Sequence, residues 1–244
     1  MSLTPTIEAL IALTESSSKG RIRAAKNVRF LPSVVDLDRL IWLIDILTEQ
    51  LESEETLELS NSLSVWINKA AQEIKTKLLE KLVNSDNIAQ RWLAAVVLGR
   101  TINAFSEDFA FEIIRRLIKD SNENVRFAAL MALKEIMKAI PKEHTIDILE
   151  ELLKSEGEDQ RAFLGTILVS LSDSLQNRII EEFLWQMLDS DNPKVVLSAL
   201  ESIKVIGKKF PKSTLKNMID KVKEKNTEPK IISELTSISD LFKL

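Results

Sequence analysis

An internal period of 35 residues constrains the fold of this chain more than any other feature. Segments that begin at Leu82, Leu117 and Leu152 align without a gap and lie 35 residues apart. In each segment the apolar end of one helix is followed by a polar stretch, an arginine and a second apolar helix. These arginines are Arg91, Arg126 and Arg161. Self-similarity at a fixed period of this length predicts stacked repeats, each of which packs on its neighbours.

The period continues in columns of apolar residues along most of the chain. One first-helix column holds Leu43, Leu78, Ile113, Ile148, Phe183 and Met218, and one second-helix column holds Leu63, Leu98, Leu133, Leu168, Ile203 and Ile238. Within a unit, apolar residues recur at i, i+3 or i+4, and i+7, which places them on one face of an α-helix. Asn192-Pro193 predicts a capped helix start in the sixth unit. The sequence therefore predicts pairs of amphipathic helices that need neighbouring pairs to bury their apolar faces.

Two helices per unit, this period and an arginine that opens the second helix resemble the HEAT repeats. The resemblance implies an all-α fold, an α-α superhelix (right-handed solenoid) of about seven two-helix repeats with second helices on the concave side. We expect a single domain over residues 1–244. Its repeats are expected at approximately 4–33, 36–69, 72–105, 107–140, 142–173, 175–210 and 212–244.

The family also implies an ion pair between an acid in the turn of each repeat and the arginine of its second helix. Asp86 with Arg91, and Glu156 with Arg161, fit this pattern. Asp120 lies one position early for Arg126. Because these turns are partly exposed, we expect such pairs to be structural and to contribute about 0–1 kcal/mol each.

The composition offers few groups for chemistry. The chain has no cysteine and one histidine, His144, at a predicted helix start, and its glycines stand singly rather than in a phosphate-binding loop. We therefore predict a non-catalytic protein with no cofactor and no metal site. The chain has neither a run of 18 apolar residues nor an N-terminal signal pattern, so we expect a cytoplasmic protein without a membrane partner.

Two specialised HEAT-like families fit the sequence poorly. HEAT-like DNA glycosylases use a basic, aromatic concave surface, whereas Trp66 and Trp92 fall in apolar columns and are interpreted as core residues. Tubulin-binding TOG domains need basic turns, whereas turns such as Asn84-Ser85-Asp86-Asn87 are neutral to acidic. Both interpretations are therefore set aside.

The second helices suggest where a partner binds. At positions that the resemblance turns towards the concavity, the middle repeats carry apolar residues: Leu93, Val96, Val97, Met131, Phe163 and Ile167. Equivalent positions towards the ends are polar: Arg23, Lys26, Glu58, Asn61, Ser198 and Glu201. Such a surface suits an amphipathic helix or an extended peptide. The alternative is that these side chains pack against each other.

Two tryptophans and an uneven charge distribution complete the candidate surfaces. Trp42 and Trp185 fall in otherwise polar columns, so each is a candidate contact residue unless it packs flat on a neighbouring helix.

Residues 204–230 hold nine lysines and three acids, although the net charge of the chain is −4. We predict a scaffold or adaptor that binds another protein or a peptide, as a monomer or weak homo-oligomer. The alternative is a nucleic-acid-binding protein that uses the lysine-rich C-terminal surface.

Overall fold

The structure, a computed structural model, describes residues 6–49, 54–137 and 142–244, and all regular structure in these ranges is helical. The first helices of the pairs are α1 (Ile7–Thr14), α3 (Leu37–Leu47), α5 (Gln72–Val83), α7 (Glu107–Ile118), α9 (Lys142–Leu153), α11 (Asn177–Leu188) and α13 (Lys212–Lys225). The second helices are α2 (Ser18–Asn27), α4 (Glu54–Ile67), α6 (Ile88–Arg100), α8 (Glu123–Ile136), α10 (Glu158–Leu171), α12 (Pro193–Ile206) and α14 (Pro229–Phe242). The prediction of an all-α fold of about seven two-helix repeats is confirmed.

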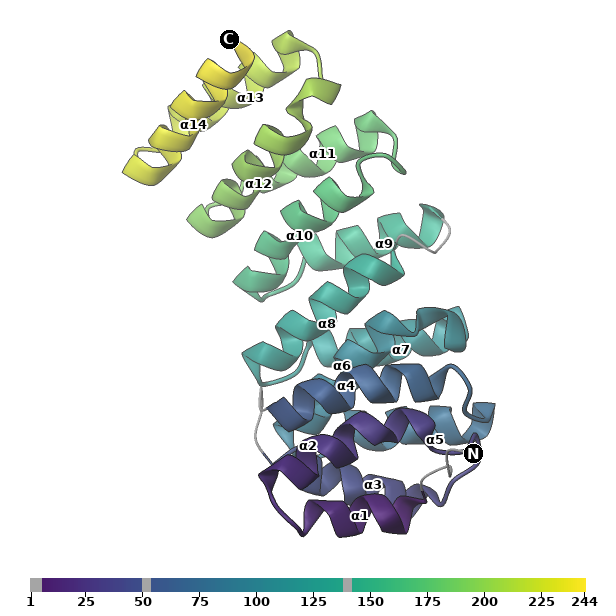
Figure 1. The fold of residues 1–244 in the computed structure, drawn as a ribbon. Helices are drawn as coiled ribbons and strands as arrows, with labels where there is room; N and C mark the ends of the chain where they lie inside the picture. The colour runs from purple at the N-terminus through teal and green to yellow at the C-terminus, as the bar shows by residue number, and fades with distance from the viewer. Residues whose placement is uncertain (1–5, 50–53, 138–141) are drawn as a thin grey trace. The chain divides into compact units, whose positions relative to one another are not determined.

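The helix pairs form two compact units, Met1–Ile136 with α1 to α8 and Met137–Leu244 with α9 to α14. In the first unit, α2, α4, α6 and α8 pack side by side in that order, and in the second α10, α12 and α14 do the same (Figure 1). Each helix pair lies within one of the expected repeat ranges. The expectation of one domain over residues 1–244 stays a prediction.

Buried aliphatic columns hold the pairs together. The predicted second-helix column Leu63, Leu98, Leu133, Leu168, Ile203 and Ile238 is almost completely buried. Trp66 is also fully buried, and its Nε1 donates a hydrogen bond of 2.8 Å to the carbonyl oxygen of Pro32. The assignment of Trp66 to the core is therefore confirmed.

Two glycines allow second helices to approach closely. A Cβ atom on Gly99 of α6 would lie 2.8 Å from the Cα atom of Ala132 on α8. A Cβ atom on Gly165 of α10 would lie 2.7 Å from the carbonyl oxygen of Ser198 on α12. Real Cβ atoms essentially never come this near to backbone, so the α6–α8 and α10–α12 contacts depend on glycine at these positions.

The ends of the second helices follow local sequence signals. Asn192 caps α12 by accepting a hydrogen bond of 2.9 Å from the Lys194 N–H, and Pro193 occupies the first helical position, as predicted. Asn87 caps α6 in the same way, with a bond of 2.8 Å from the Ala89 N–H.

Among the described residues, no helix is both long enough and apolar enough to cross a membrane.

Candidate protein-binding face

Three of the predicted contact residues lie in the core. Leu93, Val97 and Ile167 are fully buried, so the expectation that they line an exposed surface is wrong. One residue along a helix corresponds to a rotation of about 100°. An error of one position in the assumed orientation of α6 and α10 therefore exchanges exposed residues for buried ones. These three side chains belong to the cores of their own units.

The other predicted residues of this group reach the surface. Met131 of α8 is 39% exposed, and Val96 of α6 is partly exposed. Phe163 is partly exposed on α10 in the second unit. Whether these residues bind a partner stays a prediction.

The structure reveals an exposed apolar column that includes Trp92, a residue expected in the core. Leu57, Trp92 and Phe127 occupy equivalent positions of the 35-residue period, near the N-terminal ends of α4, α6 and α8. Leu57 is 45% exposed, Phe127 is 59% exposed, and Trp92 is partly exposed. The interpretation of Trp92 as a core residue is therefore corrected. The sequence shows that the positions equivalent to Trp92 are apolar. It does not show whether these positions face the core or the solvent.

These residues join with their helical neighbours into one surface, which we call the apolar face. Ile88 and Val96 lie one turn before and one turn after Trp92, and Met131 lies one turn after Phe127. The apolar face consists of Leu57, Ile88, Trp92, Val96, Phe127 and Met131. Because α4, α6 and α8 are packed side by side (Figure 1), its residues are neighbours across three consecutive repeats.

Polar contacts between second helices brace this part of the unit. Arg100 at the end of α6 donates hydrogen bonds to the Ser60 hydroxyl at 3.0 Å and to the Asn61 amide oxygen at 2.8 Å, both on α4. Lys26 of α2 forms an ion pair of 3.5 Å with Glu58 of α4. The apolar face therefore rests on helices that are linked by packing and by hydrogen bonds.

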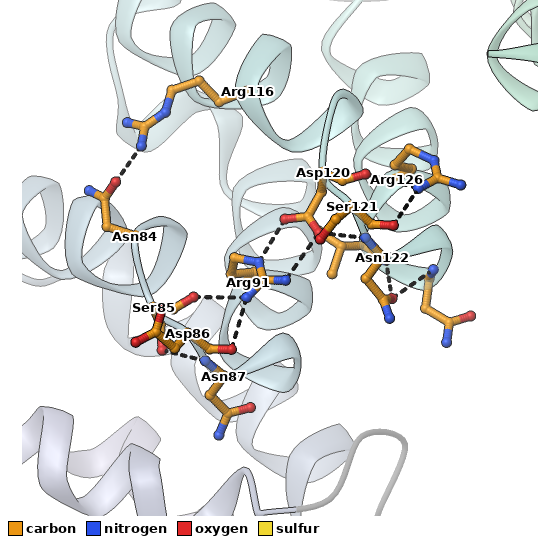
Figure 2. Close-up of polar contacts among 12 residues, drawn as sticks. Asn84, Ser85, Asp86, Asn87, Arg91, Arg116, Asp120, Ser121, Asn122 and Arg126 are labelled. Atoms are coloured by element: carbon orange, nitrogen blue, oxygen red, sulfur yellow. Dashed lines mark hydrogen bonds and ion pairs between the residues drawn. The ribbon is translucent and has the colours of Figure 1, made fainter.

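An arginine fork connects the turns of two consecutive repeats (Figure 2). The Arg91 Nε and Nη2 atoms donate to the two carboxylate oxygens of Asp120, at 2.7 and 3.1 Å. Its Nη1 atom donates to the carbonyl oxygens of Ser85 and Asp86. The predicted ion pair between Arg91 and the Asp86 carboxylate is therefore wrong, because the carboxylate comes from the next repeat.

Asp120 also organises its own turn. One carboxylate oxygen accepts a hydrogen bond of 2.8 Å from the Asn122 N–H, and the Asp120 carbonyl oxygen accepts one of 2.9 Å from Arg126 Nη1. Burial raises the pKa of the Asp120 carboxyl. The hydrogen bonds from Arg91 and Asn122 and the charges of Arg91 and Arg126 more than offset this, so the pKa lies below its ordinary value of 3.8.

Comparison with known proteins agrees with the repeat geometry. Residues 76–164 match the family model described as HEAT repeats. The archaeal HEAT-like repeats protein from Thermococcus onnurineus NA1 is 17% identical, with a TM-score of 0.54; the alignment covers 99% of this chain and 98% of that chain. Residues 76–164 are therefore similar to HEAT repeats, and the chain as a whole has the fold of a HEAT-like repeat protein.

A second solved structure supports the same fold. Cex1p is 14% identical to this chain with a TM-score of 0.59, and the alignment covers 96% of this chain and 51% of that chain. At these identities the likenesses show the fold alone. No curated protein sequence matches this chain. The matched residues 76–164 run from α5 to α10 and include every member of the apolar face except Leu57.

The two candidate tryptophans of this chain have different surroundings. Trp42 on α3 is 48% exposed, which keeps it available as a contact residue. Trp185 on α11 is partly exposed, and the Lys221 Nζ atom lies 5.4 Å from the centroid of its ring. Trp185 thus makes a cation–π contact with α13 inside the second unit. Whether either tryptophan binds a partner stays a prediction.

Many of the C-terminal lysines are paired with acids. Lys204 pairs with Glu234, Lys209 with Asp173, and both Lys221 and Lys225 with Asp189. These pairs reduce the positive potential that would attract the phosphate backbone of a nucleic acid.

In the ranges that the structure describes, no three His, Asp or Glu side chains come together as a possible metal site.

Proposed function

We propose that this chain is a non-catalytic scaffold that binds another protein or a peptide through the apolar face of α4, α6 and α8. The observation that carries the proposal is the exposed column of Leu57, Trp92 and Phe127 on three adjacent helices. Contiguous exposed apolar surface on a protein commonly marks a binding site, and large aromatic side chains supply much of the energy of protein interfaces.

The repeat geometry suits an elongated ligand. Packed helices lie about 8–10 Å apart, so the column presents an apolar side chain at this spacing along a line that crosses the helix axes. An amphipathic helix or an extended peptide lying along that line would meet Leu57, Trp92 and Phe127 in succession. Val96 and Met131 would broaden the contact by one helical turn. The braced helices would keep the surface ordered before binding, which reduces the entropic cost of association.

The proposal is tested with a charge inserted at each end of the column. We expect the double variant Leu57→Asp and Phe127→Asp to bind a partner isolated with the wild-type chain at least about tenfold more weakly, because burying an unpaired carboxylate opposes docking. The matched control is the double variant Val34→Asp and Val205→Asp, since both valines are exposed and lie outside the apolar face. Circular dichroism establishes that both variants are folded, and titration calorimetry measures their affinities. Equal affinity of all three proteins would eliminate the apolar face as the binding site.

The alternative function is nucleic-acid binding at the lysine-rich C-terminal surface. It has less support because Lys204, Lys209, Lys221 and Lys225 are engaged by acidic side chains. Binding of this kind weakens steeply as salt concentration rises. Salt-dependent retention of DNA or RNA at low ionic strength, lost on changing Lys208, Lys216 and Lys223 to glutamate, would favour this alternative over the scaffold.

A further inference from the structure

The arginine fork of the first unit has an incomplete counterpart in the second. Arg161 of α10 lies two periods after Arg91, at the same position of its repeat. Arg91 Nε donates to Asp120, whereas Arg161 Nε is buried and, among the described residues, has no hydrogen-bond partner. A buried donor of a charged group that lacks an acceptor is unfavourable. The orphaned Arg161 Nε atom therefore points to a missing acceptor.

The position of the missing acceptor follows from the same period. Two periods after Asp120 stands Ser190, in the turn before α12. The Ser190 hydroxyl oxygen accepts a hydrogen bond of 3.2 Å from the Asn192 N–H, just as an Asp120 carboxylate oxygen accepts one of 2.8 Å from the Asn122 N–H. Ser190 thus takes the place of Asp120 in its turn, but it provides a short neutral hydroxyl where Arg91 meets a carboxylate.

The acids beside Ser190 are engaged elsewhere. Asp189 forms ion pairs with Lys221 at 3.3 Å and with Lys225 at 3.6 Å, and Asp191 pairs with Lys225 at 3.2 Å. Both lysines belong to α13. Both carboxylates of this turn are therefore paired with lysines of α13, and no ion pair joins either of them to Arg161 among the described residues.

We propose that Arg161 and the Ser190 turn form a site for a phosphate group, carried on Ser190 or bound as a free anion. A phosphate presents several oxygens to a guanidinium fork and matches its planar geometry, so it would supply the acceptors that Asp120 supplies to Arg91. Phosphorylation would form a bond between Ser190 Oγ and the γ-phosphorus of a nucleoside triphosphate. A protein kinase would catalyse this transfer, with the diphosphate as leaving group and the hydroxyl proton passing to the kinase's base. The phosphorylated Ser190 would bind Arg161, link α10 to the turn before α12 and stabilise the second unit.

One arm of the test places phosphoserine at position 190 of the full chain during synthesis. We expect the melting temperature to rise by about 2–4 °C relative to the unmodified chain, an effect equivalent to one good charge-assisted contact. The rise should disappear in Arg161→Gln and shrink in Arg161→Lys, which keeps the charge but loses the fork. The variant Ser190→Asp, which reproduces the residue found at position 120, should give a smaller rise with the same dependence on Arg161.

The other arm adds inorganic phosphate to the unmodified chain, with chloride at equal ionic strength as the control. A phosphate-dependent shift and slower hydrogen exchange of the Arg161 Nε–H resonance would identify a free anion as the ligand. An Arg161-dependent effect confined to phosphoserine would identify covalent modification. If neither arm produces a change that depends on Arg161, the proposal is overturned.

Discussion

Arg91 and Asp120 differ from the exposed ion pairs of this chain in how little water reaches them. Their side chains are 15% and 9% exposed, whereas those of Lys81 and Asp38 are 47% and 87% exposed. Solvent screens an exposed pair and leaves it with little effect on stability. A bidentate pair at low exposure retains more of its attraction, and loss of one partner leaves the other without its counter-charge.

We expect Asp120→Asn to lower the free energy of unfolding by about 1.5–3 kcal/mol at pH 7, because it removes charge-assisted hydrogen bonds from a largely buried arginine. Urea unfolding followed by circular dichroism measures this difference. The matched control is Asp38→Asn, which removes an exposed pair and should leave the unfolding midpoint nearly unchanged. Equal losses in the two variants would contradict a special role for the fork.

The same pair predicts a pH dependence. The pKa of Asp120 is lower in the folded state than its ordinary value of 3.8, so the folded state binds this proton less readily than the unfolded state does. The stability contributed by the carboxylate is therefore fully present above about pH 5, and it is lost as the pH falls through the unfolded value towards the folded one. We expect the stability difference between wild type and Asp120→Asn to be constant from pH 5 to 7 and to shrink below about pH 4. A difference that grows on acidification would contradict the assigned direction of the pKa.

Two tryptophans allow the same substitution to be compared in the core and on the surface. Trp66→Phe leaves the Pro32 carbonyl without its hydrogen-bond donor and creates a void, so we expect a loss of about 1–3 kcal/mol. Trp42→Phe acts on a half-exposed ring and should change stability by less than about 0.5 kcal/mol. Thermal unfolding of both variants checks the prediction. A larger loss at position 42 would mean that Trp42 packs on its neighbours more tightly than its exposure indicates.

At the scale of helices, close contact between second helices depends on glycine. We expect Gly99→Ser to cost about 1–3 kcal/mol, because the added Cβ would overlap the Ala132 backbone and force α6 and α8 apart. Gly157→Ser is the matched control. There the Cβ would meet only the end of the Gln160 side chain and no backbone atom, and serine is a favoured residue at this helix-cap position. Urea unfolding of the two variants should differ by at least about 1 kcal/mol, and equal stabilities would show that the helices tolerate a wider spacing.

The helix pairs were predictable because each repeat places apolar residues at the same positions. Leu63, Leu98 and Leu133 recur at one position and are buried in the structure as expected. The orientation of each helix was not predictable to one residue. Trp92 and Leu93 are adjacent apolar residues, and only the packing of α6 between α4 and α8 determines that Trp92 reaches the surface while Leu93 does not.

The arginine pairing shows a second limit of sequence reasoning. The period identified Arg91, but the resemblance to HEAT repeats implied a partner in the same repeat, Asp86. The actual partner lies 29 residues later in the chain and becomes a neighbour only when consecutive repeats stack. Contacts between repeats therefore need the geometry of the stack, whereas contacts within a repeat can be inferred from spacing.

At the scale of the whole molecule, the chain divides into units that its period does not reveal. The apolar columns continue through the boundary between Ile136 and Met137, with Leu133 on one side and Leu168 on the other. Each unit nevertheless has its own buried column and its own series of packed second helices. Stability in such proteins comes from contacts between adjacent repeats, so a unit of several stacked pairs contains most of the interactions that it needs.

We therefore expect residues 1–136 and residues 137–244 each to fold when produced alone, with helical circular dichroism and cooperative urea unfolding. The control fragment, residues 1–122, removes α8 and exposes the side of α6 that packs closely on it through Gly99 and Ala132. This fragment should unfold at a lower urea concentration than residues 1–136. If residues 1–136 alone lack cooperative unfolding, the first unit depends on the second, and the apolar face would then have to be studied in the full chain. Cooperative unfolding of that fragment would instead allow the scaffold proposal to be tested on the first unit by itself, since all six residues of the apolar face belong to it.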